Sequence, residues 1–470
     1  MTKTATAVLE IINPATGRVV DRLQADDSAS VRAKYVAARA AQPEWTTVPL
    51  RERSEAIRRF REKLVEHAEE LAQTLTTEMG KPVAQARNEL KGVLGRIDFF
   101  LEEAPRALQA EVVFSEGGEG DCPLTERITH EPLGVVANIS AWNYPYFVGS
   151  NVFIPALLTG NAVLYKPSEF AALTGLAIAR LLHDSGIPRE ILTPVIGGGP
   201  AGAALLRQPV DGVFFTGSYA TGKKIARTVA GRMIKVQLEL GGKDPTYVAE
   251  DIGDVARAAA ALAEGAFYNT GQSCCSVERI YVHERIYAAF VDAFLREVKA
   301  YRIGDPRDEG TFIGPLTRAA QLAVLEGQVA DAVRKGARLL CGGKRRKGRG
   351  NYFEPTVLVD VNHRMAVMRE ESFGPIIGIM PVTDDDEAVA LMNDTPYGLT
   401  AGVYARSQKR AEAILARVRS GSSYWNCCDR VSPRLPWSGH GHSGMGLTLS
   451  RAGISTFTRP RAWHLKAPAL

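Results

Sequence analysis

The sequence has no long hydrophobic run and almost no excess of either charge. No stretch of its 470 residues approaches the roughly 18 consecutive apolar side chains that a membrane span needs, and residues 1–7 lack the apolar core of a secretion signal. The 57 basic and 52 acidic side chains leave a formal net charge of +5, which is too small over this length to indicate nucleic-acid binding. We expect no membrane partner and no nucleic-acid partner.

Cysteines are also few, and none is spaced as in a zinc ribbon or a disulfide framework. Two pairs are vicinal, and neighbouring cysteines rarely form a disulfide without strain. We therefore expect no metal site and a reduced, cytoplasmic protein. The six cysteines are Cys122, Cys274, Cys275, Cys341, Cys427 and Cys428.

What the chain does have is the length and composition of a large folded protein. The 45% hydrophobic and 23% charged fractions are those of an ordinary globular chain, and the length predicts about three domains. Before Gly134 the apolar side chains recur at helical spacing, so we expect helices at 28–42, 51–79 and 83–104. These helices are expected to form a supporting layer.

From Gly134 onward, short apolar strands alternate with helices. A second series begins with a strand at 246–248 and a helix at 255–268, and continues to about residue 430. Such alternation predicts parallel sheets with ligands at the carboxyl ends of the strands. We expect an α/β fold with two doubly wound, Rossmann-like domains. In the first series the expected strands are 135–139, 162–165, 192–196, 213–215 and 235–240, and the expected helices are 171–185, one near 201 and 221–229.

Two glycine motifs follow expected strands. Gly197-x-Gly199-x-x-Gly202 matches the dinucleotide fingerprint, but a lone match is weak in a chain with 44 glycines. Gly217-x-x-x-x-Gly222-Lys223 nearly completes a P-loop, yet Lys224 stands where a Ser or Thr hydroxyl must hold the metal ion, which argues against phosphoryl transfer. Each motif could bind an anionic or nucleotide ligand, or could simply be a tight turn.

The segment 267–275, Phe-Tyr-Asn-Thr-Gly-Gln-Ser-Cys-Cys, ends an Ala-rich helix in a glycine-containing turn. Such a turn could leave a thiol at a cleft as a nucleophile. A cysteine there could equally be a small buried hydrophobe, which is the commoner role. The segment alone leaves both readings open.

Six motifs occur along the chain in a fixed order. In type and order they resemble those of the aldehyde dehydrogenase superfamily, and the resemblance runs from the Asn-Pro-Ala-Thr-Gly segment at 13–17 to the C-terminal arm. Chance agreement of all six is negligible. The motifs are Ala141-Trp142-Asn143-Tyr144-Pro145, Gly160-Asn161 with Lys166-Pro167-Ser168-Glu169, Phe215-Thr216-Gly217-Ser218, Leu238-Glu239-Leu240-Gly241-Gly242-Lys243, Gly271-Gln272-Ser273-Cys274 and Glu371-Ser372-Phe373-Gly374-Pro375.

The resemblance implies a catalytic set. Cys274 is the implied nucleophile, with Cys275 as a bystander, because a thiolate adds readily to an aldehyde carbon. The Asn143 amide and the Cys274 backbone N–H are the implied donors to the resulting oxyanion. Glu239 is the implied base that activates water, and its apolar neighbours could raise its pKa. Lys166 is counted with both the catalytic and the cofactor residues.

The resemblance also implies a nicotinamide cofactor and the residues that hold it. A carboxylate at Glu169 would bind the ribose hydroxyls and repel a 2′-phosphate, so NAD is expected as the preferred cofactor. Lys166 could offset that repulsion, which leaves NADP possible. The implied cofactor-binding residues are Trp142, Lys166, Ser168, Glu169, Gly199, Gly217, Ser218, Gly222, Leu240, Glu371 and Phe373.

The expected substrate is a small-molecule aldehyde, and its nature stays open. Arg434, in the loop 426–435, could hold a carboxylate or be an ordinary surface arginine. Tyr144, Trp425 and Trp437 could instead receive an apolar or quaternary-ammonium tail. The expected substrate residues are Tyr144, Tyr146, Val277 and Arg434.

Two features depart from the family pattern. Ala141 stands where proline is usual before Trp-Asn, which removes a rigid turn residue. The stretch 436–448 lacks the usual lysine and the usual Arg-Glu, and has Leu447 and Thr448 in place of the latter pair. The second departure puts contacts between domains or subunits in doubt, rather than the chemistry.

The expected division is an NAD-binding domain at 1–119 and 134–242, a catalytic domain at 243–432, and an oligomerisation element at 120–133 and 455–470. Family members pair such hairpins and arms as sheet edges, so a homodimer or homotetramer is expected.

Two other functions are weighed. One is a CoA-acylating dehydrogenase, which Glu239 argues against because such enzymes tend to lack that base. The other is a non-catalytic member with a structural role, which the joint presence of Cys274, Asn143 and Glu239 argues against.

Overall fold

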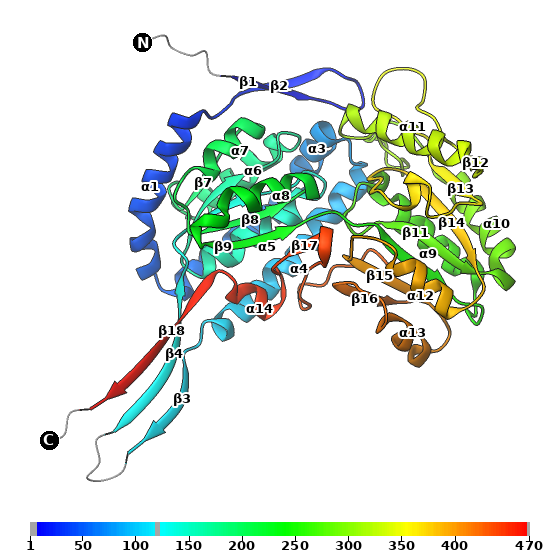
Figure 1. The fold of residues 1–470 in the computed structure, drawn as a ribbon. Helices are drawn as coiled ribbons and strands as arrows, with labels where there is room; N and C mark the ends of the chain where they lie inside the picture. The colour runs from blue at the N-terminus through cyan, green and yellow to red at the C-terminus, as the bar shows by residue number, and fades with distance from the viewer. Residues whose placement is uncertain (1–6, 118–122, 468–470) are drawn as a thin grey trace.

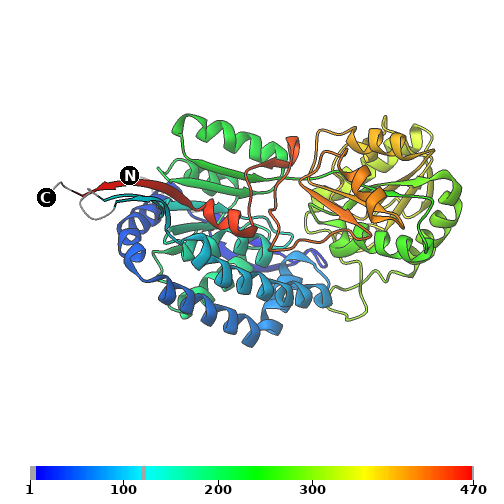
Figure 2. The same ribbon diagram turned by 90° about the horizontal axis from the view of Figure 1, so that it is seen from below.

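The fold is described from a computed structural model that covers residues 7–117 and 123–467. Gly120, Cys122 and the last three residues of the expected arm therefore lie outside the described part. A two-stranded hairpin, β1 (Val8–Ile12) and β2 (Val19–Gln24), precedes the larger elements. Two α/β domains lie side by side, and a β arm projects from the first (Figures 1 and 2).

The first domain is built on a six-stranded sheet in the order β17-β9-β8-β5-β6-β7. Its strands run parallel, except that β17 lies antiparallel to β9. Every residue of β5 and β6 is buried, as expected for parallel strands covered on both faces. The strands are β5 (Val135–Ile139), β6 (Ala162–Lys166), β7 (Leu192–Pro194), β8 (Gly212–Thr216), β9 (Lys235–Glu239) and β17 (Gly444–Met445).

Helices surround this sheet, and α2, α3 and α4 add the supporting layer, with α4 packed on α5. The expected single helix at 51–79 is two helices, because the backbone of His67 leaves helical geometry and separates α2 from α3. The helices are α1 (Ser28–Thr47), α2 (Leu50–Glu66), α3 (Ala68–Met79), α4 (Val83–Ala107), α5 (Pro145–Leu158), α6 (Ala172–Asp184), α7 (Gly199–Leu206), α8 (Tyr219–Val229) and α14 (Ser450–Ser455).

The second domain has a seven-stranded sheet in the order β12-β13-β14-β11-β10-β15-β16, parallel except for β12 against β13. Val248 and Val282 pack in one apolar cluster with α9 and α10, whereas Tyr247 and Tyr281 pack in another with α11, α12 and α13. Neighbouring residues thus face opposite sides, so both faces of the sheet are covered.

The strands of this domain are β10 (Asp244–Val248), β11 (Val277–His283), β12 (Arg338–Cys341), β13 (Thr356–Val359), β14 (Ile376–Val382), β15 (Thr400–Tyr404) and β16 (Ser422–Trp425). Its helices are α9 (Val255–Phe267), α10 (Glu284–Ala300), α11 (Ala319–Arg334), α12 (Asp385–Asn393) and α13 (Gln408–Leu415). The short 3-10 helices of the chain are η1 (Ala230–Arg232), η2 (Tyr268–Gly271), η3 (Ala366–Met368) and η4 (Gly441–Ser443). The expected α/β fold with two doubly wound domains is confirmed.

The projecting arm is a three-stranded antiparallel sheet in the order β18-β4-β3. Its strands are β3 (Glu111–Glu116), β4 (Leu124–Pro132) and β18 (Thr458–Lys466). The expected element at 120–133 therefore begins too late, since β3 already belongs to the arm. All six β3 residues are exposed, so this strand has no buried face whose alternation would mark it in the sequence.

Among the described helices, none combines the length and apolar character that crossing a bilayer requires. Within the same described ranges, no group of three or more His, Cys, Asp or Glu side chains is arranged to hold a metal ion.

Asn161 ties the arm to the first domain. Its side-chain oxygen accepts from Gly134 N at 2.8 Å, and its amide donates to the carbonyl oxygens of Ala156 at 3.2 Å and Phe457 at 3.0 Å. The residue is fully buried. It therefore joins the entry to β5, the end of α5 and the start of β18 in one network.

Replacing Asn161 with alanine should destabilise the protein by about 2 to 4 kcal/mol, because Gly134 N loses its acceptor and the carbonyl oxygens of Ala156 and Phe457 each lose a donor in a buried site. Denaturant unfolding monitored by circular dichroism measures the change. Gln73→Ala is the control, because Gln73 bonds only the exposed Glu69 on its own helix and should change stability by less than about 0.5 kcal/mol. Equal stability of the two variants would contradict the role of the network.

Candidate active site

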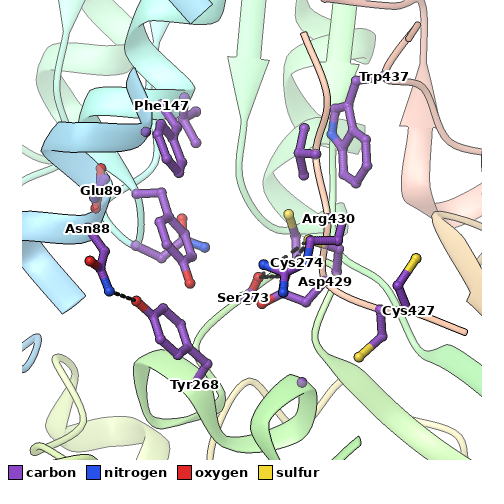
Figure 3. Close-up of a pocket in the computed structure, with 18 of the residues that line it drawn as sticks. Asn88, Glu89, Phe147, Tyr268, Ser273, Cys274, Cys427, Asp429, Arg430 and Trp437 are labelled. Carbon is purple, nitrogen blue, oxygen red and sulfur yellow. Dashed lines mark hydrogen bonds between the residues drawn. The ribbon is translucent and has the colours of Figure 1, made fainter. Parts of the chain in front are cut away.

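A cavity of about 840 Å³ lies between the two domains. Its walls come from α4, α5, α9, the turn that carries Cys274, and the loop after β16. Asn88 and Glu89 on one wall face Ser273, Cys274 and Asp429 on the other (Figure 3). Of the expected catalytic residues, Cys274, Asn143 and Glu239 all line this cavity.

The turn before Cys274 has an unusual backbone. Asn269, Thr270 and Gly271 have φ values of 53°, 60° and 70°, and left-handed geometry at a non-glycine residue costs about 1 to 3 kcal/mol. The turn is held in place, because Asn269 N donates to Gln85 Oε1 at 2.9 Å and Gly314 N donates to Thr270 Oγ1 at 3.1 Å. The surrounding structure thus stabilises a geometry that leaves Cys274 partly exposed to the cavity.

Asn143 is joined to this turn by hydrogen bonds. Its side-chain amide donates to the Gln272 carbonyl oxygen at 3.1 Å. The Asn269 amide donates to the carbonyl oxygens of Asn143 at 3.2 Å and of Gln272 at 3.1 Å. The first-domain loop with Asn143 and the turn with Cys274 are therefore held together. Sequence reasoning did not single out Asn269, although it lies inside the quoted Cys274 segment.

Glu239 ends β9 and reaches the cavity from the first domain. Burial raises the pKa of its carboxyl to about 7, and a hydrogen bond from the Thr448 hydroxyl and the charge of Arg96 act in the opposite direction. Thr448 lies in the stretch that departs from the family pattern. Sequence reasoning missed this contact because Thr448 and Glu239 are far apart in the chain.

Cys275 and Asp429 form a second pair in the cavity wall. The buried Cys275 thiol donates to Asp429 Oδ1 at 3.0 Å, and the Ser273 hydroxyl donates to the same oxygen at 3.3 Å. A hydrogen bond with Cys274, burial and the nearby Asp429 raise the pKa of Cys275 well above its ordinary value. Burial also raises the pKa of Asp429 to about 6. Cys275 is thus held as a neutral thiol at neutral pH.

The expected adenosine-side residues cluster at the carboxyl end of β6. The buried Lys166 Nζ lies 3.9 Å from Glu169 Oε2, and the Ser168 hydroxyl donates to the same carboxylate at 3.3 Å. Gly198 and Gly199 open α7 beside them, and a Cβ on Gly198 would lie 3.8 Å from Glu169 Oε1. The charged side chains of Lys166 and Glu169 thus lie next to glycine backbone at the start of α7.

The glycine turn after β8 continues this cradle. Ser218 caps α8 by accepting from Thr221 N at 3.4 Å, and Gly217 precedes it. Gly222 packs so closely on Leu240 that a Cβ would overlap its side chain. Both expected glycine motifs therefore open helices at the carboxyl edge of the same sheet. A pyrophosphate fits at such a place.

The expected nicotinamide-side residues come from the second domain. Glu371 lies over Gly241, where a Cβ would overlap its carboxylate, and it accepts from Gly242 N at 3.1 Å. Burial raises the pKa of Glu371 to about 8. The rings of Phe373 and Trp142 meet edge to face at 5.5 Å. A partly buried carboxyl group with one backbone partner fits a ribose hydroxyl, so the cradle suits a dinucleotide.

Two of the four expected substrate residues line the cavity. Tyr144 stacks on Phe147, and Arg434 stands exposed at the cavity wall. Tyr146 and Val277 do not line the cavity, and the expectation for both is corrected. Tyr146 is 1% exposed in the first-domain core, because α5 begins at Pro145 and turns this side chain away from Tyr144 and Phe147. Val277 starts β11, whose residues are all buried in the second-domain core.

The departing stretch 436–448 still connects the domains. Its strand β17 pairs with β9, and the Ser443 hydroxyl accepts from Gly398 N at 3.0 Å. The His442 ring stacks on Tyr219 of α8 at 3.7 Å. Contacts between the domains are therefore present without the usual lysine and Arg-Glu.

Two α/β domains, with a cysteine turn and a dinucleotide cradle meeting at one cavity, define a nicotinamide-dependent oxidoreductase. Comparison with known proteins narrows the class. The model of the "Aldehyde dehydrogenase family" matches residues 1–463. Lactaldehyde dehydrogenase of Escherichia coli (strain K12) is 34% identical over 464 residues, which are 98% of this chain and 96% of that protein.

Two further comparisons agree. Succinate-semialdehyde dehydrogenase [NADP(+)] of Deinococcus radiodurans is 35% identical over 453 residues, 96% of this chain and 93% of that protein. The crystal structure of an NAD-dependent aldehyde dehydrogenase from Sinorhizobium meliloti matches with a TM-score of 0.94 at 34% identity, over 98% of this chain and 92% of that one. The chain belongs to the aldehyde dehydrogenase family. It is an NAD(P)-dependent aldehyde dehydrogenase that oxidises aldehydes to carboxylic acids.

Replacing Thr448 with valine should raise the pKa of Glu239 by about 0.5 to 1 pH unit, because the lost hydrogen bond stabilises the ionised carboxylate. Difference infrared titration of the carboxyl band measures it, with Glu239→Gln to assign the band. Thr448→Ser keeps the hydroxyl and should keep the midpoint near that of the unaltered protein. An unchanged midpoint in Thr448→Val would refute the contact.

Proposed function

We propose that the protein oxidises an aldehyde through a thioester on Cys274, with NAD as the preferred hydride acceptor and water as the final nucleophile. The observation that carries this proposal is that Cys274, Asn143 and Glu239 line one cavity, although they come from different parts of the chain. The proposal assigns residue roles within the family's activity. It also divides the chain into an NAD-binding and a catalytic domain.

In the first step, the Cys274 thiolate adds to the aldehyde carbon and the carbonyl oxygen becomes an oxyanion. The Asn143 amide and the Cys274 backbone N–H donate to that oxygen. Because Asn143 is already bonded to the Cys274 turn, its amide is oriented before substrate binds. Loss of one such donor typically costs about 3 to 4 kcal/mol of barrier.

A bound nicotinamide would supply the acceptor for the hydride of the thiohemiacetal carbon, and Cys274 would then carry a thioester. Lys166, Ser168 and Glu169 would hold its adenosine ribose, and Glu371 its nicotinamide ribose. The Glu169 carboxylate would repel a 2′-phosphate, whereas Lys166 would attract one. We expect NAD to be preferred, with NADP accepted less well.

In the last step, Glu239 takes a proton from the water that attacks the thioester carbon, and the Cys274 thiolate leaves. A pKa near 7 suits a base at neutral pH, since part of the carboxyl is then ionised and its conjugate acid is weak. The same base favours hydrolysis over transfer to coenzyme A. It also argues against a non-catalytic structural role.

Cys274→Ala should abolish NAD reduction with simple aldehydes, whereas Cys275→Ala should retain most of it, because only Cys274 is proposed to form the thioester. The assay follows absorbance at 340 nm with NAD and NADP in parallel, and mass spectrometry of acid-quenched protein locates the acyl adduct. Turnover by Cys274→Ala at an undiminished rate would contradict the proposed mechanism. Product that forms only when coenzyme A is added would favour the acylating alternative.

We further propose a homodimer or homotetramer that forms through the arm. The outer strand β3 is a sheet edge, and it exposes Val112, Val113 and Phe114 together. An exposed edge with apolar side chains invites pairing with another chain. A reduced compartment, such as the cytoplasm, suits the thiolate that the mechanism requires.

Val113→Lys with Phe114→Glu should shift the protein towards monomer, because charges on β3 oppose edge pairing. Sedimentation velocity measures the change. The matched control is Val36→Glu, since Val36 is an exposed apolar residue on α1, and it should leave the sedimentation coefficient unchanged. If the unaltered protein is a monomer, or if the β3 variant sediments as the unaltered protein does, assembly through the arm is contradicted.

A further inference from the structure

One face of α4 forms a wall of the cavity and contains two glycines. Glu89, Gly92, Gly95 and Arg96 recur at helical spacing on that face. A glycine inside a helix costs about 1 kcal/mol relative to alanine. A Cβ at Gly92 would lie only 2.8 Å from Phe147 Cζ, whereas one at Gly95 would meet nothing within 4 Å. Gly92 thus admits an aromatic ring, and Gly95 leaves open space beside Arg96.

Arg96 is a buried cation that forms no close ion pair among the described residues. It is 6% exposed, its guanidinium lies 4.1 Å from the centre of the Phe147 ring, and Nη1 donates to Asn151 Oδ1 at 2.8 Å. In the part of the chain that the structure describes, this is its one side-chain hydrogen bond, and no carboxylate lies within 4.0 Å. Burial lowers the pKa of Arg96 to about 10, although the nearby charges of Glu239 and Glu89 act in the opposite direction. Most of its N–H donors therefore remain available to a ligand.

Four acidic residues line the cavity; Glu264 on α9 is exposed, and the other three are already engaged. Glu89 forms a buried ion pair with Lys81, and also accepts from Tyr146 N at 2.9 Å. Asp429 accepts from Ser273 and Cys275 and has its pKa raised to about 6. Glu239, with a pKa of about 7, accepts from Thr448. None of them neutralises Arg96 by direct contact.

The other cations of the cavity add to the same charge. Lys91, Arg430 and Arg434 also line it and are more exposed, towards its mouth. Among the described residues, none of the three has a carboxylate within 4.0 Å. Of the four cations that line the cavity, Arg96 is the least exposed.

We propose that Arg96 binds the negatively charged end of the substrate, which makes the preferred substrates aldehydes that carry a carboxylate at their far end. This inference rests on the proposed function for its substrate, and it deepens that function. The planar guanidinium matches a carboxylate through two parallel hydrogen bonds. Asn151 fixes one edge of the group and Phe147 supports its face, so the guanidinium is oriented before the ligand arrives.

The proposal also explains the neighbouring glycine. A carboxylate that binds Arg96 needs room beside the helix, and Gly95 leaves that room. A cation or a neutral tail would leave the buried guanidinium without an anionic partner. Discrimination against such tails therefore comes from the unpaired charge and not only from shape.

The test compares 4-oxobutanoate with its methyl ester, which has nearly the same shape but no charge. We expect kcat/KM to be higher for the acid in the unaltered enzyme. Arg96→Gln should lower kcat/KM for the acid by roughly ten- to hundredfold, mainly through KM, and for the ester by less than about threefold. Arg96→Lys should restore part of the preference. Arg106→Gln, which removes an exposed cation from the same helix outside the cavity, should change neither value.

Equal loss with both substrates in Arg96→Gln would mean a structural role and overturn the proposal. So would a larger loss of acid preference in Arg434→Gln, which would move the anion site to the mouth, or the absence of any preference in the unaltered enzyme. Calorimetric titration with succinate, which is the acid product, tests the site without turnover. Succinate binding that Arg96→Gln weakens at least tenfold supports the anion site even if no aldehyde is oxidised, and in that case only the proposed function fails.

Discussion

The hydrogen bonds between the Asn143 loop and the Cys274 turn are the contact on which the site depends. Asn143 belongs to the first domain and Gln272 to the turn that leads into the second, so these bonds fix the two domains where the chemistry takes place. Asn269 completes the connection by donating to both carbonyl oxygens. Its left-handed backbone is unfavourable by itself, and the bonds that it makes offset that cost.

Buried ion pairs extend the same principle to the cofactor side. Lys243 pairs with Glu278, and Glu278 accepts from Ser372 N at 2.9 Å and Phe373 N at 3.0 Å. This network holds the loop that carries Glu371 over Gly241. In the described ranges Glu371 has no cation within 4.0 Å, and its pKa is raised, as are those of Glu239 and Asp429. The Lys243–Glu278 pair thus has a structural role, whereas Glu371, Glu239 and Asp429 form no ion pair within 4.0 Å among the described residues.

Sequence reasoning predicts the buried parallel strands well, because each is a short apolar run between helices. The expected strand 135–139 coincides with β5, and the expected β/α order holds throughout the first domain. Strand β3 was not predicted, because all its residues are exposed and no alternation of buried and exposed side chains marks it in the sequence. Tyr146 was misplaced because neighbouring residues at a helix start point in different directions, and only the position of the first helical residue decides which one faces the cavity.

The same contrast explains why the motifs point to the residues of the proposed chemistry but not to those of the proposed substrate specificity. Cys274, Asn143 and Glu239 occupy turns and strand ends, where backbone geometry restricts the residue type and leaves a recognisable motif. Arg96 lies in the middle of a long helix, where the backbone geometry leaves no recognisable motif. Its proposed role depends on what is missing around it, namely a close ion pair and a side chain at Gly95. Absences of this kind are visible only when α4, α5 and the loop after β16 are seen together, so specificity has to be inferred from the cavity walls.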